Sequence, residues 1–117
     1  MKQDYLQIRV LEMAPLVYVC GQLFETDMQL LGKQKVRTIV NNRFDDESTG
    51  QPKSDDLEKA AEEYGITFVH FPVDAISISD EDLRSFADIC DDLERPLFLF
   101  SRSGKRSIKL WEKAESL

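Results

Sequence analysis

The sequence has few cysteines and no long apolar run, and each shortage excludes a class of protein. Its two cysteines, Cys20 and Cys90, are too few for a disulfide framework and match no zinc-binding spacing, so we expect both to be small buried hydrophobes. The best candidate for a membrane span, Val10–Cys20, is interrupted by Glu12 and falls short of the roughly 20 residues required. Charged residues near the N-terminus also exclude a signal peptide. The sequence therefore predicts a cytoplasmic protein with no membrane-bound part.

Positive charge is also scarce. Fifteen lysines and arginines stand against 22 aspartates and glutamates, which gives a net charge of −7 at pH 7. Such a chain lacks the positive face that nucleic-acid binding requires. Nine of the 22 acidic residues lie in two segments, residues 45–47 and 80–92, which we expect to be solvated surface. Against this background, three cations gather in SRSGKRS (101–107), and a cluster so local predicts a local role.

The remaining composition is that of a globular domain, with 42% apolar and 32% charged residues in 117 positions. We expect residues 1–117 to form a single domain. Short apolar runs predict strands buried on both faces. These runs are Leu16–Cys20, Val36–Asn41, Thr67–Phe71 and Leu97–Phe100, with Ile8–Leu11 as a candidate edge strand. Helical patterns separate them, which predicts an α/β domain of three layers: a central, mostly parallel sheet of four to five strands with helices on both faces.

The predicted helices have start and stop signals. Thr26 opens a capping box for a short helix that Gly32 would end. Ser54 and Ser79 each precede acidic residues, a pattern that favours a helix N-terminus. The segment Phe44–Lys53 is rich in aspartate, glycine, proline and serine, and it predicts a flexible loop between elements.

The segment 101–107 leaves the last predicted strand at its carboxyl end, where ligands bind in parallel sheets. It then opens the last helix, whose N-terminal N–H groups and dipole favour an anion. Gly104 permits a tight backbone curl, and the arginine forks suit an oxyanion. A solvated turn, whose cations pair with the neighbouring acidic surface, is equally compatible with these features taken alone.

Five stretches resemble, in order and spacing, the phosphatase-like domain family of the beta-lactamase hydrolase-like proteins, which has the cysteine-phosphatase and rhodanese-like fold. They are VCGQL (19–23), VRTIVNNRFDDE (36–47), GITFVHFPVD (65–74), ISDEDLRSFADIC (78–90) and FSRSGKRSIKLW (100–111). The resemblance implies that Ser101 occupies the place of the nucleophile, that Arg106 stabilises the oxyanion, and that Asp74 is the general acid.

Further residues are candidates for anion binding through their place in the loop or at the carboxyl end of the second predicted strand. They are Arg102, Ser103, Gly104, Lys105, Ser107 and Arg43. Two of the assignments have structural alternatives. Asp74 could cap a turn, and Arg43 could form a surface salt bridge.

The sequence departs from the family at Ser101, where the family has cysteine. Cations and a helix end lower the pKa of a cysteine from about 8.5 to as little as about 3.5, but a serine hydroxyl needs a neighbouring base. The one histidine, His70, lies within a predicted strand, where packing or a structural hydrogen bond is expected. Serine at 101 is therefore engineered, or native to a pseudoenzyme that binds anions without turnover, or active by another route.

Loop length adds a further consideration. Four residues separate Ser101 from Arg106, whereas tyrosine and dual-specificity phosphatases have five, and the shorter loop resembles that of sulfurtransferases. The favoured function is a phosphatase-like hydrolase domain that binds a phosphate or similar oxyanion at Ser101–Ser107, with activity impaired by the serine. A persulfide-carrying sulfurtransferase domain and a non-catalytic module for phosphorylated ligands are the alternatives. We expect no cofactor and no metal, and a small phosphorylated or otherwise anionic ligand as partner.

Overall fold

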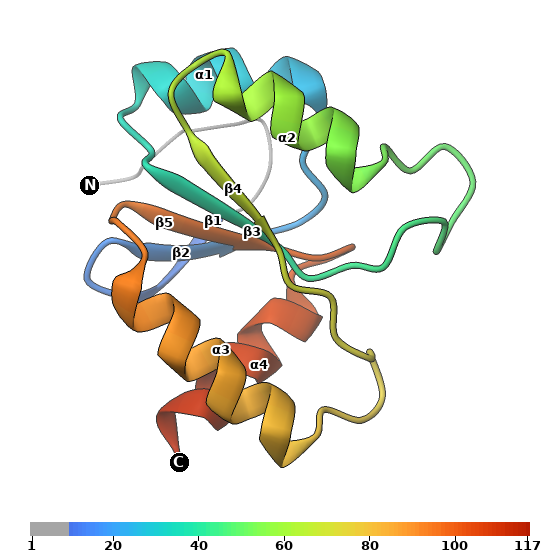
Figure 1. Ribbon diagram of the computed structural model, residues 1–117, viewed down its shortest axis with the longest axis vertical. Coiled ribbons are helices and arrows are strands. Elements are labelled where there is room, and N and C mark those ends of the chain that lie inside the picture. Colours follow the sequence, from blue (N-terminus) through green and yellow to red (C-terminus); the bar gives the residue numbers. More distant parts are fainter. Residues whose placement is uncertain (1–9) are drawn as a thin grey trace.

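The computed structural model describes residues 10–117 and contains one five-stranded sheet between two layers of helices (Figure 1). In chain order the elements are β1 (Val10–Ala14), β2 (Val17–Cys20), the 3-10 helix η1 (Glu25–Asp27), α1 (Met28–Lys33), β3 (Thr38–Asn41), α2 (Ser54–Glu62), β4 (Thr67–His70), α3 (Asp80–Asp92), β5 (Leu97–Phe100) and α4 (Lys105–Glu115). The strand order is β1-β2-β5-β3-β4, with β1 antiparallel to β2 and the other pairs parallel. The predicted α/β class is confirmed.

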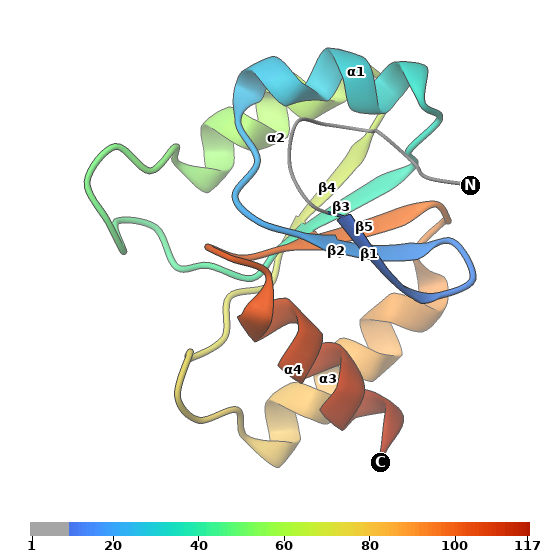
Figure 2. The ribbon, with the colours of Figure 1, turned by 180° about the vertical axis from the view of Figure 1, so that it is seen from behind.

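Helices α1 and α2 cover one face of the sheet, and α3 and α4 cover the other (Figures 1 and 2). The continuously apolar sequence of β5 is explained by its burial on both faces of the sheet. Phe98 and Phe100 pack toward α1 and α2, whereas Leu97 and Leu99 pack toward α3 and α4, and all four are fully buried. A strand at the centre of a three-layer domain has no solvent face, so it shows no polar alternation. No helix within residues 10–117 is long and apolar enough to cross a membrane.

The first strand differs from the prediction. The edge strand expected at Ile8–Leu11 is Val10–Ala14, and it forms an antiparallel hairpin with β2; Ile8 lies outside the described residues. Leu16, expected to begin β2, instead has a left-handed backbone with φ of 61°. It belongs to the turn, so β2 begins at Val17.

The prediction of a Thr26 capping box with a Gly32 stop is wrong. The carboxylate of Asp27 accepts the Phe24 N–H (2.7 Å), and the helical segment begins at Glu25, two residues before the start that a Thr26 cap predicts. Gly32 lies inside α1, and a Cβ atom there would be 2.9 Å from the Cβ of Tyr64. The glycine is therefore explained by the close packing of α1 against the end of α2, not by helix termination.

The other two predicted helix starts have different outcomes. Ser79 caps α3 as predicted, because its hydroxyl accepts the N–H of Asp82 (3.0 Å). Ser54 is the first residue of α2 rather than its cap, and its own N–H donates to a carboxylate oxygen of Asp45 (2.9 Å). The capping group for α2 thus comes from the preceding loop, nine positions away.

Candidate anion-binding site

The carboxyl ends of the parallel strands meet at one edge of the sheet, and the loop after β5 lies in the middle of that edge (Figure 1). Because β5 pairs with β2 on one side and β3 on the other, its loop is flanked by the loops that follow both neighbours. Two backbone hydrogen bonds tie these loops together. Gln22 N–H donates to the carbonyl of Arg102 (3.2 Å), and Asn42 N–H donates to the carbonyl of Phe100 (3.0 Å).

Gly104 shapes the loop that leads into α4. Its φ is +96°, in the left-handed region, and the helix begins at the next residue. A Cβ atom at this position would lie 3.2 Å from the carbonyl oxygen of Cys20. The loop thus passes directly against the end of β2, and both the conformation and the space require glycine.

The loop presents backbone donors that the fold does not use. Within residues 10–117, the N–H groups of Arg102, Ser103 and Gly104 donate to no protein acceptor. They precede the N-terminus of α4, where the helix dipole adds partial positive charge. The side chains of Arg102, Ser103 and Lys105 are exposed. The arrangement offers several donors to an anion and, among the described residues, no competing carboxylate on the loop itself.

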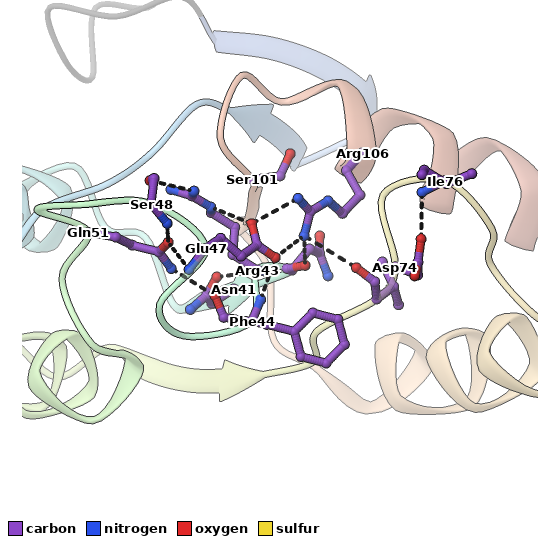
Figure 3. Close-up of polar contacts among 12 residues, drawn as sticks. Asn41, Arg43, Phe44, Glu47, Ser48, Gln51, Asp74, Ile76, Ser101 and Arg106 are labelled. Atoms are coloured by element: carbon purple, nitrogen blue, oxygen red, sulfur yellow. Dashed lines mark hydrogen bonds and ion pairs between the residues drawn. The ribbon is translucent and has the colours of Figure 1, made fainter.

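Arg106, in the first turn of α4, is fixed by two neighbouring loops (Figure 3). Its Nη1 donates to the carbonyls of Asn42 (3.0 Å) and Val73 (3.2 Å), and its Nη1 and Nη2 bind the two carboxylate oxygens of Glu47 at 2.8 and 2.9 Å. Its side chain is only 12% exposed. The Nε–H of Arg106 is buried and has no acceptor among the described residues. That group and the second Nη2 proton form one edge of the planar guanidinium, and no hydrogen-bond acceptor among the described residues pairs with this edge.

Glu47 is a central residue of the site that the sequence analysis missed. Besides Arg106, its carboxylate accepts hydrogen bonds from Arg43 Nε (3.0 Å) and from the Phe44 N–H (2.9 Å). Hydrogen bonding to Arg106 is the main cause that lowers its pKa to about 2, with Arg43 and Phe44 adding to the effect. Glu47 lay in an acidic run that was expected to be solvated surface. The sequence did contain one signal for this ion pair, because the oppositely charged Arg43 lies four positions before Glu47, just after the same strand.

Arg43 is nearly fully buried, with 3% exposure, and each nitrogen of its guanidinium has a partner. Nη1 donates to Gln22 Oε1 (2.6 Å), Nη2 donates to Ser48 Oγ (3.0 Å), and Nε donates to Glu47. The ion pair expected at the surface thus has a buried arginine, whereas the Glu47 side chain is 21% exposed. The hydrogen bond from Arg43 to Gln22 links the loops after β2 and β3.

The segment Phe44–Lys53, predicted to be a flexible loop, is held by its own hydrogen bonds. Gln51 Oε1 accepts the N–H groups of Glu47 (3.1 Å) and Ser48 (3.3 Å), while Gln51 Nε2 donates to the Phe44 carbonyl (2.9 Å). The segment is therefore an ordered loop next to Arg106, and its fold places the Glu47 carboxylate in contact with the Arg106 guanidinium.

Ser101 and Ser107 lie at the base of the loop, where both are buried. The N–H of Ser107 donates to Ser101 Oγ (3.3 Å). The hydroxyl of Ser107 donates to Oδ1 of Asn42 (2.7 Å), a fully buried residue whose Nδ2 donates to the carbonyl of Phe71 (2.9 Å). The role of Asn42 at the base of the loop was not predicted, because in the sequence it is only the second of two adjacent asparagines at the end of a strand.

Asp74 lies on the loop after β4 and is exposed. One of its carboxylate oxygens accepts hydrogen bonds from the N–H groups of Ile76 (2.7 Å) and Ser77 (3.2 Å). Asp74 therefore caps a turn, which was the structural alternative to a catalytic role. These bonds, chiefly that from Ile76, lower its pKa, and the charge of Arg106 adds to the effect. A general acid requires a shift in the opposite direction.

His70 does not reach Ser101. Its Nε2–H donates to the carbonyl of Arg43 (2.6 Å), which confirms the expected structural hydrogen bond. Cys20 and Cys90 are buried as predicted; burial raises the pKa of both thiols, that of Cys90 to about 12. Among residues 10–117, no three side chains of the metal-binding types lie together in a way that could hold a metal ion.

Sequence comparison finds relatives over nearly the whole chain. Residues 8–117 match the family described as beta-lactamase hydrolase-like protein, phosphatase-like domain. The chain is 30% identical, over 99 residues, to a beta-lactamase hydrolase-like protein of Agrobacterium fabrum, a match that covers 85% of this chain and 23% of that protein. The chain thus spans about a quarter of the length of this curated relative.

Solved structures show the same architecture. A candidate phosphatase from Neisseria meningitidis is 31% identical and superposes with a TM-score of 0.76, covering 81% of this chain and 68% of that one. A Pseudomonas aeruginosa TpbA variant with one cysteine replaced by serine, solved in complex with phosphotyrosine, is 19% identical with a TM-score of 0.64, covering 89% of this chain and 59% of that one. The second likeness shows the fold alone.

Proposed function

Since this chain belongs to the phosphatase-like domain family of the beta-lactamase hydrolase-like proteins, we propose that it binds a phosphate monoester or similar oxyanion at Ser101–Ser107. Arg106 and the free N–H groups of the loop are the proposed ligand-binding groups. In this proposal Ser101 stands in the nucleophile's place without a base, so the chain as it stands hydrolyses such esters slowly or not at all.

One observation carries this proposal: the free edge of the Arg106 guanidinium. A buried donor with no partner is unfavourable, and a charged one is more so. The Nε–H of Arg106 is such a donor, on a side chain that Glu47 and two carbonyls hold in place. An oxyanion bound across Nε and Nη2 would satisfy this edge in the bidentate geometry that arginine favours. Neighbouring N–H groups at the start of α4 would bind its remaining oxygens.

Asp74 is proposed as the general acid in the liganded form. In the structure described here, the turn's N–H groups, and to a smaller extent the charge of Arg106, favour the ionised carboxylate and lower its pKa. A bound phosphate dianion would offset the charge of Arg106 and shift the pKa of Asp74 upward. Its place on the loop that also supplies the Val73 carbonyl to Arg106 supports this role.

Anion binding can be tested directly on the unmodified chain. Inorganic phosphate should raise its melting temperature, because a ligand that binds the native state stabilises it. Arg106→Ala should abolish the increase, whereas Lys109→Ala, one helical turn further along α4, should retain it. No stabilisation of the unmodified chain by millimolar phosphate would overturn the proposed site.

The chemistry needs a second experiment. Ser101→Cys should hydrolyse para-nitrophenyl phosphate at a rate well above that of the unmodified chain, because the cations and helix end would yield a thiolate. Ser116→Cys, at the exposed far end of α4, supplies a matched thiol outside the loop and should remain inactive. If Ser101→Cys instead takes sulfur from thiosulfate and leaves the phosphate ester intact, the domain is a sulfurtransferase.

A further inference from the structure

The hydrogen bonds at the base of the loop determine which protons remain available to a ligand. Asn42 is the starting point, because the orientation of its amide is fixed. Nδ2 lies 2.9 Å from the carbonyl oxygen of Phe71, which can only accept. A flipped amide would place two acceptor oxygens against each other, so Oδ1 must be the atom that faces Ser107.

This orientation commits the hydroxyl of Ser107. It has a single proton, and the contact of 2.7 Å with Oδ1 of Asn42 requires that proton. Both side chains are fully buried, so water does not compete for the bond. The Ser107 hydroxyl therefore cannot donate to position 101, which receives a hydrogen bond from the Ser107 backbone N–H alone.

Ser101 is left with an unused proton. Its Oγ accepts the Ser107 N–H at 3.3 Å, and the side chain is 1% exposed. Within residues 10–117, this hydroxyl donates no hydrogen bond to a protein acceptor. The other groups of the loop and of Arg106 that have no partner among the described residues are donors as well: the N–H groups of residues 102–104 and the Nε–H of Arg106. An acceptor for the Ser101 proton must then come from outside the protein.

We propose that Ser101 is a ligand-binding residue whose hydroxyl donates to an oxygen of the bound oxyanion, while Asn42 takes the hydroxyl proton of Ser107. This inference rests on the proposed function and makes it more specific. A serine at the start of the loop adds a neutral donor to a site built from donors. The chain is then suited to hold a fully deprotonated tetrahedral oxyanion, such as a phosphate monoester dianion, rather than to attack it.

A cysteine at the same position would have the opposite effect on ligand affinity. Surrounded by cations and a helix N-terminus, it would be largely a thiolate at neutral pH. A thiolate cannot donate, and its charge repels an anion. Alanine is intermediate, because it neither donates nor repels. The affinity for inorganic phosphate at pH 7 should therefore decrease from serine to alanine to cysteine at position 101.

Isothermal titration calorimetry with inorganic phosphate tests this order. Ser101→Ala should weaken binding roughly tenfold, as expected for the loss of a hydrogen bond to a charged group, and Ser101→Cys should weaken it further. Ser107→Ala removes a hydroxyl that is committed to Asn42, so it should change the affinity by less than about threefold. Ser116→Ala is the matched control on the exposed end of α4 and should have no effect.

The outcomes separate this inference from the function on which it rests. Equal affinity for serine, alanine and cysteine at position 101, with binding still lost in Arg106→Ala, would overturn the role of Ser101 and leave the anion site intact. No binding by the unmodified chain would overturn both. Proton NMR gives an independent readout: a slowly exchanging Ser107 hydroxyl proton should show a cross-peak to Asn42 without ligand, and a Ser101 hydroxyl proton should appear on phosphate addition. Absence of the Ser107–Asn42 cross-peak would contradict the hydrogen-bond assignment.

Discussion

Glu47 and Arg106 are 59 positions apart in the sequence, yet Oε2 of Glu47 lies 2.8 Å from Nη1 of Arg106. Through the same carboxylate, Glu47 also binds Arg43, which is almost inaccessible to solvent. One carboxylate thus neutralises two guanidinium groups, and the Nε edge of Arg106 has no partner within residues 10–117. The loop that the sequence predicted to be flexible positions the arginine that we propose binds the ligand.

Replacement of Glu47 should destabilise the fold. Glu47→Gln would leave Arg43 buried without its charge partner, and removal of one member of such a pair is strongly destabilising. We expect a decrease of about 2–3 kcal/mol in the free energy of unfolding, measured with urea. Asp46→Asn is the matched control: Asp46 pairs with Lys53 at the surface, with 79% and 62% of the side chains exposed, and should cost less than about 0.5 kcal/mol. Equal effects of the two substitutions would contradict the central role of Glu47.

The same carboxylate predicts a pH dependence of stability. The pKa of Glu47 is lowered from 4.5 to about 2 in the folded chain, so the folded state binds its proton more weakly than the unfolded state. Its contribution is therefore fully present above about pH 4.5 and is lost as the pH falls toward about 2. The stability difference between the unmodified chain and Glu47→Gln should narrow over this interval, as measured by urea unfolding at several pH values. Parallel pH profiles would contradict the assignment.

Gly104→Ala should affect both stability and ligand binding. The substitution places a Cβ 3.2 Å from the Cys20 carbonyl on a backbone with φ of +96°. We expect a cost of at least about 1–2 kcal/mol from the left-handed conformation alone and a weaker affinity for phosphate, because the loop must shift. Gly50→Ala isolates the conformational part, since Gly50 has a φ of +80° and no atom within 4 Å of the added Cβ. Phosphate affinity should be unchanged in that control.

The proposed acid can be tested in the Ser101→Cys background. Asp74→Asn keeps an acceptor oxygen for the turn, so the fold should be preserved. If Asp74 protonates the leaving group, the substitution should lower kcat for an alkyl phosphate by about 10²–10⁴-fold and affect para-nitrophenyl phosphate much less, because nitrophenolate needs little protonation. Equal rate losses for both esters would assign Asp74 to the turn alone.

Strands and layers were predictable because local signals determine them. The all-apolar run Leu97–Phe100 predicts a strand buried on both faces, and β5 has that position at the centre of the sheet. The alternation of strand and helix predicted the parallel sheet, and the sheet in turn indicated the edge at which a loop after β5 would meet its neighbours. Element boundaries were less predictable, since Leu16 and Gly32 are explained by a turn and by a contact with a distant residue.

The candidate site likewise has features that local sequence determines and features that depend on contacts between distant residues. The sequence by itself determined that residues 101–107 form a cation-rich loop before a helix, because glycine, charge and strand–helix order are local properties. Only the tertiary structure decided that Glu47 restrains Arg106, that buried Arg43 binds Gln22 of the loop after β2, and that Asn42 takes the proton of Ser107. These partners come from separate loops, and hydrogen bonds between groups so far apart in the chain depend on the strand order that brings those loops together.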